Sequence, residues 1–365
     1  MTSLSTVENE ASGRAAAWRR AIEGVSGHIR ASAVLEIAAD APDWTDSGID
    51  LEKGDGVTLL SQGVVWLSRD FNIGFEGMAA LWYRVGDGPV ERAGGRTTSV
   101  IVDRSGRLRL AARPPGPWLE QPDAPAGGDS WAGSGSIAVA AIRWQESIAA
   151  GLAALARTDT TGLAAAEAAR HAAALPPPAG WHPHPVIGKS AIFTAGPLAD
   201  HRHGISCRCV QDVGILQYSV DVALDDTTRL NWSWQMTHLP SAVAENQLPT
   251  HDYLSIAVEF ENGLDLTYLW SSSLPVGTHF RCPLPYWDQR ETHWVARSGS
   301  AALGRWLDEQ RPVLADYREA IGGPPPSRIV AVWLIAVSLF QRDFGECAYA
   351  GISISNADGI AASIS

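Results

Sequence analysis

Short segments of alternating apolar and polar residues dominate the first half of the chain. Turn-forming sequences rich in glycine and aspartate, such as EKGDG (52–56) and DRSGR (103–107), separate them. Alternation with a period of two is typical of strands that bury one face, and short strands at this spacing predict a β-sandwich. The predicted strands are VLEIAAD (34–40), GVTLLSQGVVWL (56–67), ALWYRVG (80–86), SVIVD (99–103), RLRLAAR (107–113) and SIAVAAI (136–142).

Two segments follow helical periodicity instead. Residues 9–24 place Trp18 and Ile22 four positions apart, which predicts a short amphipathic helix. Residues 144–176 are rich in alanine, a strong helix former, and predict a helical connector with a break near Thr160–Gly162. The prolines of LPPPAGWHPHP (175–185) end this connector.

These patterns predict a mainly β chain with two β-sandwich (jelly-roll-like) domains joined by an alanine-rich helical connector. The predicted parts are an N-terminal helix (1–29), a first sandwich (30–143), the helical connector with its proline-rich linker (144–185) and a second sandwich (186–365).

Three segments of the second half carry residues with catalytic potential. LNWSWQMTH (230–238), DYLSIAVEF (252–260) and LDLTYLW (264–270) are expected to pair consecutively as an antiparallel meander. Asn262-Gly263 is a strong hairpin signal, so we expect a two-residue turn there. That turn sets the predicted facing pairs, which are Glu259 with Leu266, Ala257 with Tyr268 and Ser255 with Trp270.

Such a meander gathers histidines at one rim of the sheet. His238 ends the first strand, His251 and Asp252 open the second, and His279 follows the third. Histidine titrates near neutrality, and a neighbouring aspartate fixes its tautomer, which suits proton transfer. The predicted catalytic residues are His238, His251, Asp252 and Glu259, and the predicted substrate-binding residues are Trp232, Trp234, Tyr268, Trp270 and His279.

This arrangement predicts an enzyme of the lyase, isomerase, cyclase or hydrolase type that acts on a partly apolar small molecule. The sequence holds no phosphate-binding loop, dinucleotide fingerprint, zinc-protease motif or nucleophile elbow, so we predict no cofactor. The alternative is a non-catalytic protein that binds a carbohydrate or another small ligand, because sandwiches of this kind often bind sugars.

Composition narrows the choice of partners. The 365-residue chain has a formal net charge of −12, which argues against nucleic acid and anionic membranes because phosphate repulsion would stay uncompensated. The four cysteines are too few for a disulfide scaffold. The N-terminal sequence lacks an apolar core of signal-peptide length, so we expect a cytoplasmic protein whose partner is a small molecule.

The stretch HRHGISCRC (201–209) holds two histidines and two cysteines, the donor count of a zinc site. Two side chains spaced C-x-C on a strand share a face but lie about 7 Å apart, unlike the converging thiols of a C-x₂-C turn. We therefore predict that Cys207 and Cys209 are core residues and that this stretch holds no metal.

Part of the first half resembles a known sugar-binding domain. WTDSGIDLEKGDGVTLLSQGVVWL (44–67), LWYRVGDGP (81–89) and the glycine-rich loop before SIAVAAI are similar to the bacterial galactophilic lectin domain over residues 40–143. The resemblance implies a sandwich that holds galactose through calcium. Here the stretch that should supply oxygen ligands begins AARPPGPW, which places Arg113 and prolines beside the calcium position. We expect the fold without the calcium chemistry.

The second half resembles the uncharacterised DUF3047 family over most of residues 200–355. That family shows W-x-W, an acidic pair with tyrosine before a strand, Y-x-W…G-T and W…E-x-R…D-Y-R. This chain departs from it at His251, which replaces the first acid, and at SLFQRDFGE (338–346), which replaces an acidic stretch. The resemblance implies no activity. The matching positions are Trp232, Trp234, Asp252, Tyr253, Tyr268, Trp270, Gly277, Trp306, Glu309, Arg311, Asp316, Tyr317 and Arg318.

Overall fold

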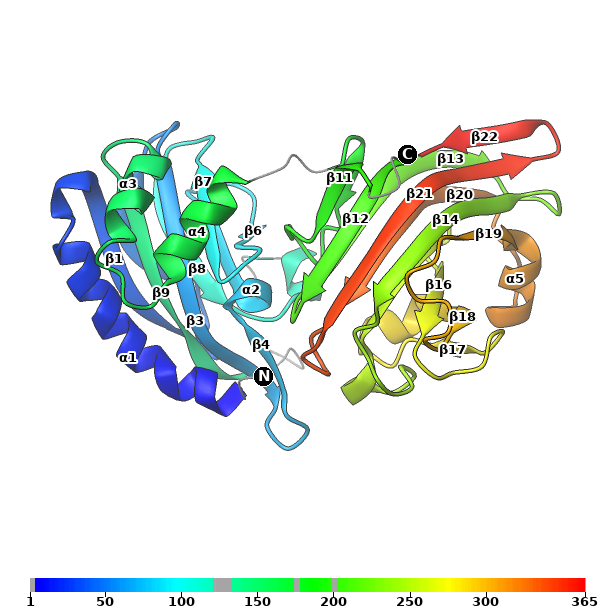
Figure 1. Ribbon diagram of the computed structural model, residues 1–365, viewed down its shortest axis with the longest axis horizontal. Helices are drawn as coiled ribbons and strands as arrows, with labels where there is room; N and C mark the ends of the chain where they lie inside the picture. Colours follow the sequence, from blue (N-terminus) through cyan, green and yellow to red (C-terminus); the bar gives the residue numbers. More distant parts are fainter. Residues whose placement is uncertain (1–3, 121, 123–132, 174–177, 199–201, 365) are drawn as a thin grey trace. The chain divides into compact units, whose positions relative to one another are not determined.

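The chain folds into two compact units, each built on two β-sheets (Figure 1). The prediction of two mainly β sandwich domains is confirmed. None of the helices in the described ranges combines the length and apolarity that crossing a bilayer requires. The first unit comprises residues 1–174 and 185–190, and the second comprises 175–184 and 191–365. The computed structural model describes residues 4–120, 122, 133–173, 178–198 and 202–364.

The first unit is centred on β3, whose sequence is apolar on both faces. Residues 56–66 of this strand are all buried, since one face meets helices and the other meets the second sheet. The five-stranded sheet contains β1 (Ile29–Ala38), β9 (Ser134–Trp144), β3 (Gly56–Ser68) and β4 (Ile73–Glu76), with β7 (Thr97–Ile101) paired to β3. The four-stranded sheet contains β2 (Thr45–Leu51), β8 (Gly106–Ala112), β5 (Leu81–Val85) and β6 (Glu91–Arg92).

Helices cover the outer face of the five-stranded sheet (Figure 1). Trp18 and Leu152 pack in one buried cluster with Leu60 and Ile142 of the sheet. The alanine-rich segment, expected to connect the domains, therefore lies within the first unit, where its apolar side buries against the sheet. The α-helices of the unit are α1 (Leu4–Glu23), α2 (Gly77–Ala80), α3 (Ile148–Leu155) and α4 (Leu163–Ala172).

The predicted break in the alanine-rich segment is confirmed. Gly162 precedes α4 with a positive φ of 78°, a conformation that favours glycine. The Asp159 carboxylate accepts hydrogen bonds from the backbone N–H of Thr161 and of Ala164, both at 2.9 Å. A capping aspartate followed by glycine thus ends one helix and starts the next.

The second unit packs a seven-stranded sheet against a six-stranded sheet around one apolar core. All strand pairs are antiparallel except β16 with β18. The seven-stranded sheet runs β10 (Trp181–Pro183), β13 (Val213–Ala223), β20 (Arg328–Val337), β15 (Tyr253–Phe260), β16 (Asp265–Ser271), β18 (Glu291–Ser298) and β17 (His279–Arg281). The six-stranded sheet runs β11 (Phe193–Pro197), β12 (His203–Val210), β21 (Phe344–Asn356), β14 (Arg229–His238) and β19 (Leu307–Pro312), with β22 (Gly359–Ser363) on β21; helix α5 spans Val313–Ala320.

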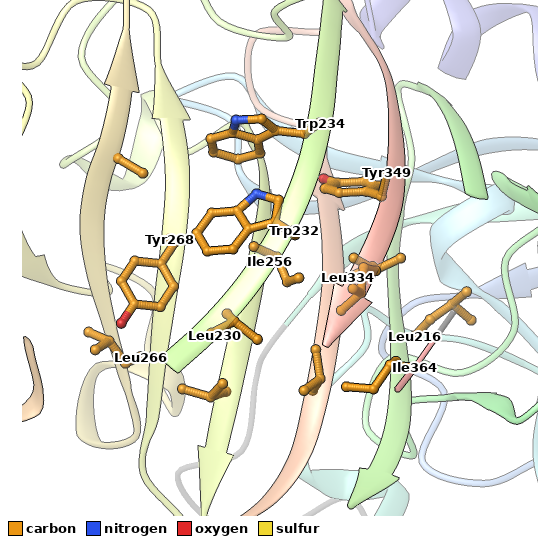
Figure 2. Close-up of a cluster of buried hydrophobic side chains, with 14 of the residues drawn as sticks. Leu216, Leu230, Trp232, Trp234, Ile256, Leu266, Tyr268, Leu334, Tyr349 and Ile364 are labelled. Carbon is orange, nitrogen blue, oxygen red and sulfur yellow. The ribbon is translucent and has the colours of Figure 1, made fainter. Parts of the chain in front are cut away.

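Strict alternation decides which side chains enter this core. The predicted core side of β15, which includes Leu254, Ile256 and Val258, is fully buried in it. Trp232 and Trp234 of β14 enter from the opposite sheet, and Figure 2 shows their rings beside Tyr268 of β16. The meander prediction is therefore wrong for its first strand, because β14 pairs β21 and β19 and faces β15 across the sandwich.

The predicted β15–β16 hairpin exists, but its register is shifted by one residue. Phe260 donates its N–H to the Leu264 carbonyl, so the loop has three residues, 261–263, and not two. Gly263 closes it with φ 77°. Changing the loop length by one reverses which face each side chain of β16 occupies. The observed pairs are Glu259 with Asp265, Val258 with Leu266, Ala257 with Thr267, Ile256 with Tyr268 and Ser255 with Leu269.

Candidate functional site

The aromatic residues predicted to floor a cleft belong to the hydrophobic core. The register shift turns Tyr268 and Trp270 inward, and Trp232 and Trp234 enter the same core from the other sheet. Figure 2 shows Trp232, Trp234 and Tyr268 in this core. None of the four is more than 2% exposed. The prediction that they hold a substrate on an open face is therefore not supported, since a ligand cannot reach them in the folded domain.

Most polar atoms of these rings have partners inside the fold. Trp270 donates its indole N–H to the Gly299 carbonyl at 2.9 Å. Trp234 donates to a Glu309 carboxylate oxygen at 3.0 Å. Such bonds satisfy buried donors, so they serve stability.

The predicted acid–base residues do not line one sheet, since β14 and β15 belong to different sheets. His238 stacks on Phe344 with ring centroids 3.8 Å apart. His279 is exposed and stacks on Trp294 at 5.4 Å. The Glu259 carboxylate accepts a hydrogen bond from Gln217 at 3.1 Å, and burial raises its pKa.

Asp252 fastens a loop. Its carboxylate is fully buried and accepts hydrogen bonds from the backbone N–H of Phe340, at 3.0 Å, and of Gln341. Burial raises the pKa of Asp252 to about 7, although these backbone bonds act in the opposite direction. The side chain holds the segment after β20 against the start of β15, and it faces no solvent.

His251 belongs to a buried cluster that sequence reasoning did not find. Its imidazole lies with Cys282, Glu291 and His293, and one ligand-type atom from each of the four lies within 4.8 Å of the others. Hereafter these four residues are called the inner cluster. The imidazole Nε2 of His251 is 3.3 Å from the Cys282 thiol, and its Nδ1 is 2.5 Å from the Glu245 carbonyl oxygen. All four residues are at most 3% exposed.

Strand pairing brings the inner cluster together. Glu291 and His293 lie two apart on β18, so they share the face opposite Trp294, which enters the core. Cys282 follows β17, which pairs with β18. His251 lies two residues before the start of β15. The sequence signal that could have pointed to this site is the alternation Glu-x-His on a strand, with a cysteine nine residues before the glutamate.

A second polar site is a surface hollow on the first unit, here called the arginine hollow. It has a volume of about 330 Å³ and is lined by Pro42, Asp43, Trp44, Asp46, Arg84, Arg109, Arg113 and Pro122. It mixes guanidinium donors, carboxylate acceptors and one half-buried indole.

Sheet register aligns the charges of the arginine hollow. Arg109 of β8 faces Arg84 of β5 on one side and Asp46 of β2 on the other. The Arg84 guanidinium lies over the Trp44 ring, 4.7 Å from its centroid. Two like charges directly opposite each other destabilise a sheet, so an anion placed between them would relieve repulsion. The side chain of Arg109 forms no hydrogen bond or ion pair with the residues that the structure describes.

The thiols of HRHGISCRC behave as predicted. Cys207 and Cys209 of β12 point into the core of the second unit. The Cys209 thiol donates to the Asp212 carbonyl at 3.1 Å, and burial raises its pKa well above the usual range. His203 is exposed, and His201 lies outside the described residues.

Comparison with protein families confirms the DUF3047 resemblance of the second half. Residues 179–353 match the model of a family described as "Protein of unknown function (DUF3047)". The N-terminal region is similar to the solved "EclA N-terminal domain; PllA-like lectin", with 18% identity over 30% of this chain and 94% of that chain and a TM-score of 0.24. No curated protein matches the sequence.

Other similar solved structures have low identity. The family 11 carbohydrate-binding module of a Clostridium thermocellum cellulase is 10% identical over 47% of this chain and 81% of its own, with a TM-score of 0.24. The xyloglucanase domain of NopAA from Sinorhizobium fredii is 7% identical over 45% of this chain and 92% of its own, with a TM-score of 0.28.

Proposed function

We propose that the protein is a non-catalytic binder whose N-terminal unit takes an acidic carbohydrate. The DUF3047 match covers residues 179–353, in the other unit, and implies no activity. The observation that carries the proposal is the cross-strand pair Arg84 and Arg109 at the arginine hollow, beside Trp44. The ligand class follows from the chemistry of the hollow.

Each part of the hollow matches one feature of such a ligand. Guanidinium groups bind carboxylates through paired charge-assisted hydrogen bonds, which suits a uronic acid. Asp43 and Asp46 offer acceptors for hydroxyl groups. Trp44 offers apolar indole surface for the C–H groups of a sugar ring. The chain concentrates three arginines here against a net charge of −12, so an anionic ligand meets locally favourable charge.

The acid–base enzyme predicted from the sequence is the weaker hypothesis. His251 and Asp252 are fully buried, and His238 and Glu259 have partners of their own on different sheets. A general base must lie within hydrogen-bond reach of its substrate. Among the described residues, these four side chains do not line a common surface that a substrate could reach.

Isothermal titration of the full chain with a galacturonate oligomer and with galactose tests the proposal. We expect the acidic sugar to bind and the neutral sugar to bind at least about tenfold more weakly, because a charge-assisted hydrogen bond contributes roughly 1.5–3 kcal/mol. Arg109→Gln should lower the affinity for the acidic sugar about tenfold or more, for the same reason.

Arg104→Gln is the matched control, because Arg104 is exposed, pairs with Asp103 and does not line the hollow. It should leave binding unchanged. Equal affinity for both sugars, or an Arg109→Gln variant that binds as tightly as the control, contradicts the proposal.

A further inference from the structure

We propose that the inner cluster is a metal site: His251, Cys282, Glu291 and His293 bind one zinc ion, or a divalent transition-metal ion of similar preference. The site lies in the second unit and is independent of the sugar-binding proposal. Two imidazoles, a thiolate and a carboxylate are the donor types that zinc takes, whereas calcium and magnesium prefer oxygen donors alone.

The donor spacing is close to that of a tetrahedral site. Bonds of roughly 2.0–2.3 Å to one ion place the donors about 3.3–3.8 Å from one another. The Cys282 thiol is 3.3 Å from Nε2 of His251, and a Glu291 carboxylate oxygen is 3.6 Å from Nε2 of His293. All four donors lie within 4.8 Å of one another, so binding needs a closure of about 1–1.5 Å at most.

Neighbouring groups already orient two of the donors. The Glu245 carbonyl accepts the Nδ1–H of His251, which leaves the lone pair of Nε2 directed at Cys282. A metal-bound histidine usually gives its other ring N–H to such an acceptor. Glu245 contacts His251 through its backbone carbonyl. Its side-chain carboxylate accepts hydrogen bonds from the Ser271 hydroxyl and the Ser272 N–H.

The carboxylate of Glu291 is held in the same way. Tyr253 donates its hydroxyl to Oε1 at 3.0 Å. The Thr267 hydroxyl lies between this oxygen, at 3.2 Å, and an Asp265 carboxylate oxygen, at 3.0 Å. Oε2 remains on the side of His293. Hydrogen bonds of this kind to ligating carboxylates are typical of metal sites, where they set the direction of the free oxygen.

His293 is the independent sign that something binds here. Its imidazole is 0% exposed, and neither ring nitrogen makes a hydrogen bond with any of the described residues. It stacks on Phe280 with centroids 5.0 Å apart, which fixes the ring without satisfying it. Leaving a buried polar group unpaired costs roughly 1–3 kcal/mol, and a metal–nitrogen bond removes that cost.

The charges balance when a divalent ion binds. The Cys282 thiol loses its proton to solvent as the metal–sulfur bond forms, and the thiolate with the Glu291 carboxylate then carries two negative charges. Two neutral imidazoles add none. The site becomes neutral overall, which a position with at most 3% exposure requires.

A cysteine–histidine nucleophile is the competing use of the same pair, and burial disfavours it. Cys282 is 1% exposed, and burial raises the pKa of its thiol far above the usual range. A catalytic cysteine needs a lowered thiol pKa and access to substrate. Metal binding needs neither access for a large molecule nor a free thiolate before the ion arrives.

Metal analysis of the full-length protein, expressed with zinc supplementation and desalted, tests the proposal. We expect about one zinc per chain in the wild type, and less than a tenth of that in His293→Ala. Cobalt(II) added to stripped protein should give the visible bands of tetrahedral cobalt together with thiolate charge transfer in the near ultraviolet. Cys282→Ser should lose the charge-transfer band, because its sulfur supplies it.

His279→Gln is the matched control, because this exposed histidine lies on β17 beside the cluster without belonging to it. It should keep full metal content. Circular dichroism shows whether each variant is folded. A folded wild-type protein that carries no stoichiometric metal and gives no cobalt spectrum overturns the proposal, as does a Cys282→Ser variant with an unchanged charge-transfer band.

Discussion

Asp316 shows how single acids stabilise the core of the second unit. Its carboxylate accepts two hydrogen bonds from Arg311, at 2.8 and 2.7 Å, and one from the Tyr268 hydroxyl at 2.9 Å. The Arg311 guanidinium in turn lies 4.8 Å from the centroid of the Trp294 ring. These residues stand at positions that resemble the DUF3047 pattern, and in this structure they join core rings to helix α5 and β19.

Asp316→Ala should lower the free energy of unfolding by about 3 kcal/mol, because it leaves a partly buried arginine and a buried hydroxyl unpaired. Urea denaturation followed by tryptophan fluorescence measures the change. Asp226→Ala is the control: Asp226 pairs with Arg318 at the surface, where side-chain exposures of 78% and 52% limit the effect to less than about 1 kcal/mol. Equal losses in both variants would contradict the assigned role of Asp316.

At the scale of elements, one extra loop residue decides which rings are buried. The alternation of β15 and of β16 is readable from the sequence, and the core side of β15 is predicted correctly. Which residues of β16 share a face with the core side of β15 depends on the length of the turn. The Asn-Gly pair alone does not determine that length. A three-residue loop ending at Gly263 places Tyr268 inside the sandwich.

Gly263→Ala should destabilise the second unit by about 1 kcal/mol, because φ of 77° is unfavourable for a residue with a Cβ. An alanine Cβ at this position meets no atom within 4 Å, so the cost is conformational alone. Gly196→Ala is the control, since its Cβ also meets nothing and no positive φ occurs there. Thermal melts that show the same shift for both variants would argue against the loop geometry.

The partner of a strand is harder to predict than its faces. β14 precedes β15 in the chain, yet they lie in opposite sheets, and β16 pairs in parallel with β18. Alternation specifies which residues are buried but carries no information on which neighbour supplies the hydrogen bonds. The inner cluster depends on such non-local pairing, so only His251 was predicted to have a functional role, with the wrong companions.

At the scale of the whole molecule, buried histidines link stability to pH. His184 is 6% exposed and lies between Trp287 and Trp333, with ring centroids 5.4 and 5.0 Å away. Burial lowers its pKa from 6.5 to about 4, with a smaller contribution from the charge of Arg290. Between these two pH values the His184 imidazole is protonated in the unfolded chain and neutral in the folded unit.

The stability of the second unit should therefore be unaffected by this group above about pH 6.5 and fall as the pH drops to about 4. His184 should account for a total decrease of roughly 3 kcal/mol in the free energy of unfolding. Urea denaturation at several pH values, with a chelator present to exclude metal release, measures it. His184→Phe should lose less stability than the wild type between pH 6.5 and 4, whereas the exposed His279→Gln should match the wild type. Because burial also lowers the pKa of His251 to about 3, some acid loss remains in His184→Phe, and only a loss as large as that of the wild type would contradict the assignment.

The chain's two candidate sites differ in how far the sequence reveals them. The sequence places Arg113 beside the calcium position that the lectin resemblance implies, and Arg113 lines the arginine hollow. Arg84 and Arg109 become neighbours only through the pairing of β5 with β8, which a sequence pattern does not supply. Fold class and domain number follow from local periodicity, while each candidate site follows from contacts between distant strands.

All four cysteines are buried, and all four belong to the second unit. An alkylating reagent can therefore modify a thiol only during moments when that half of the chain opens, and the first half contributes no signal. The rate of labelling in dilute buffer thus measures the opening of one half within the intact protein, without any engineered probe.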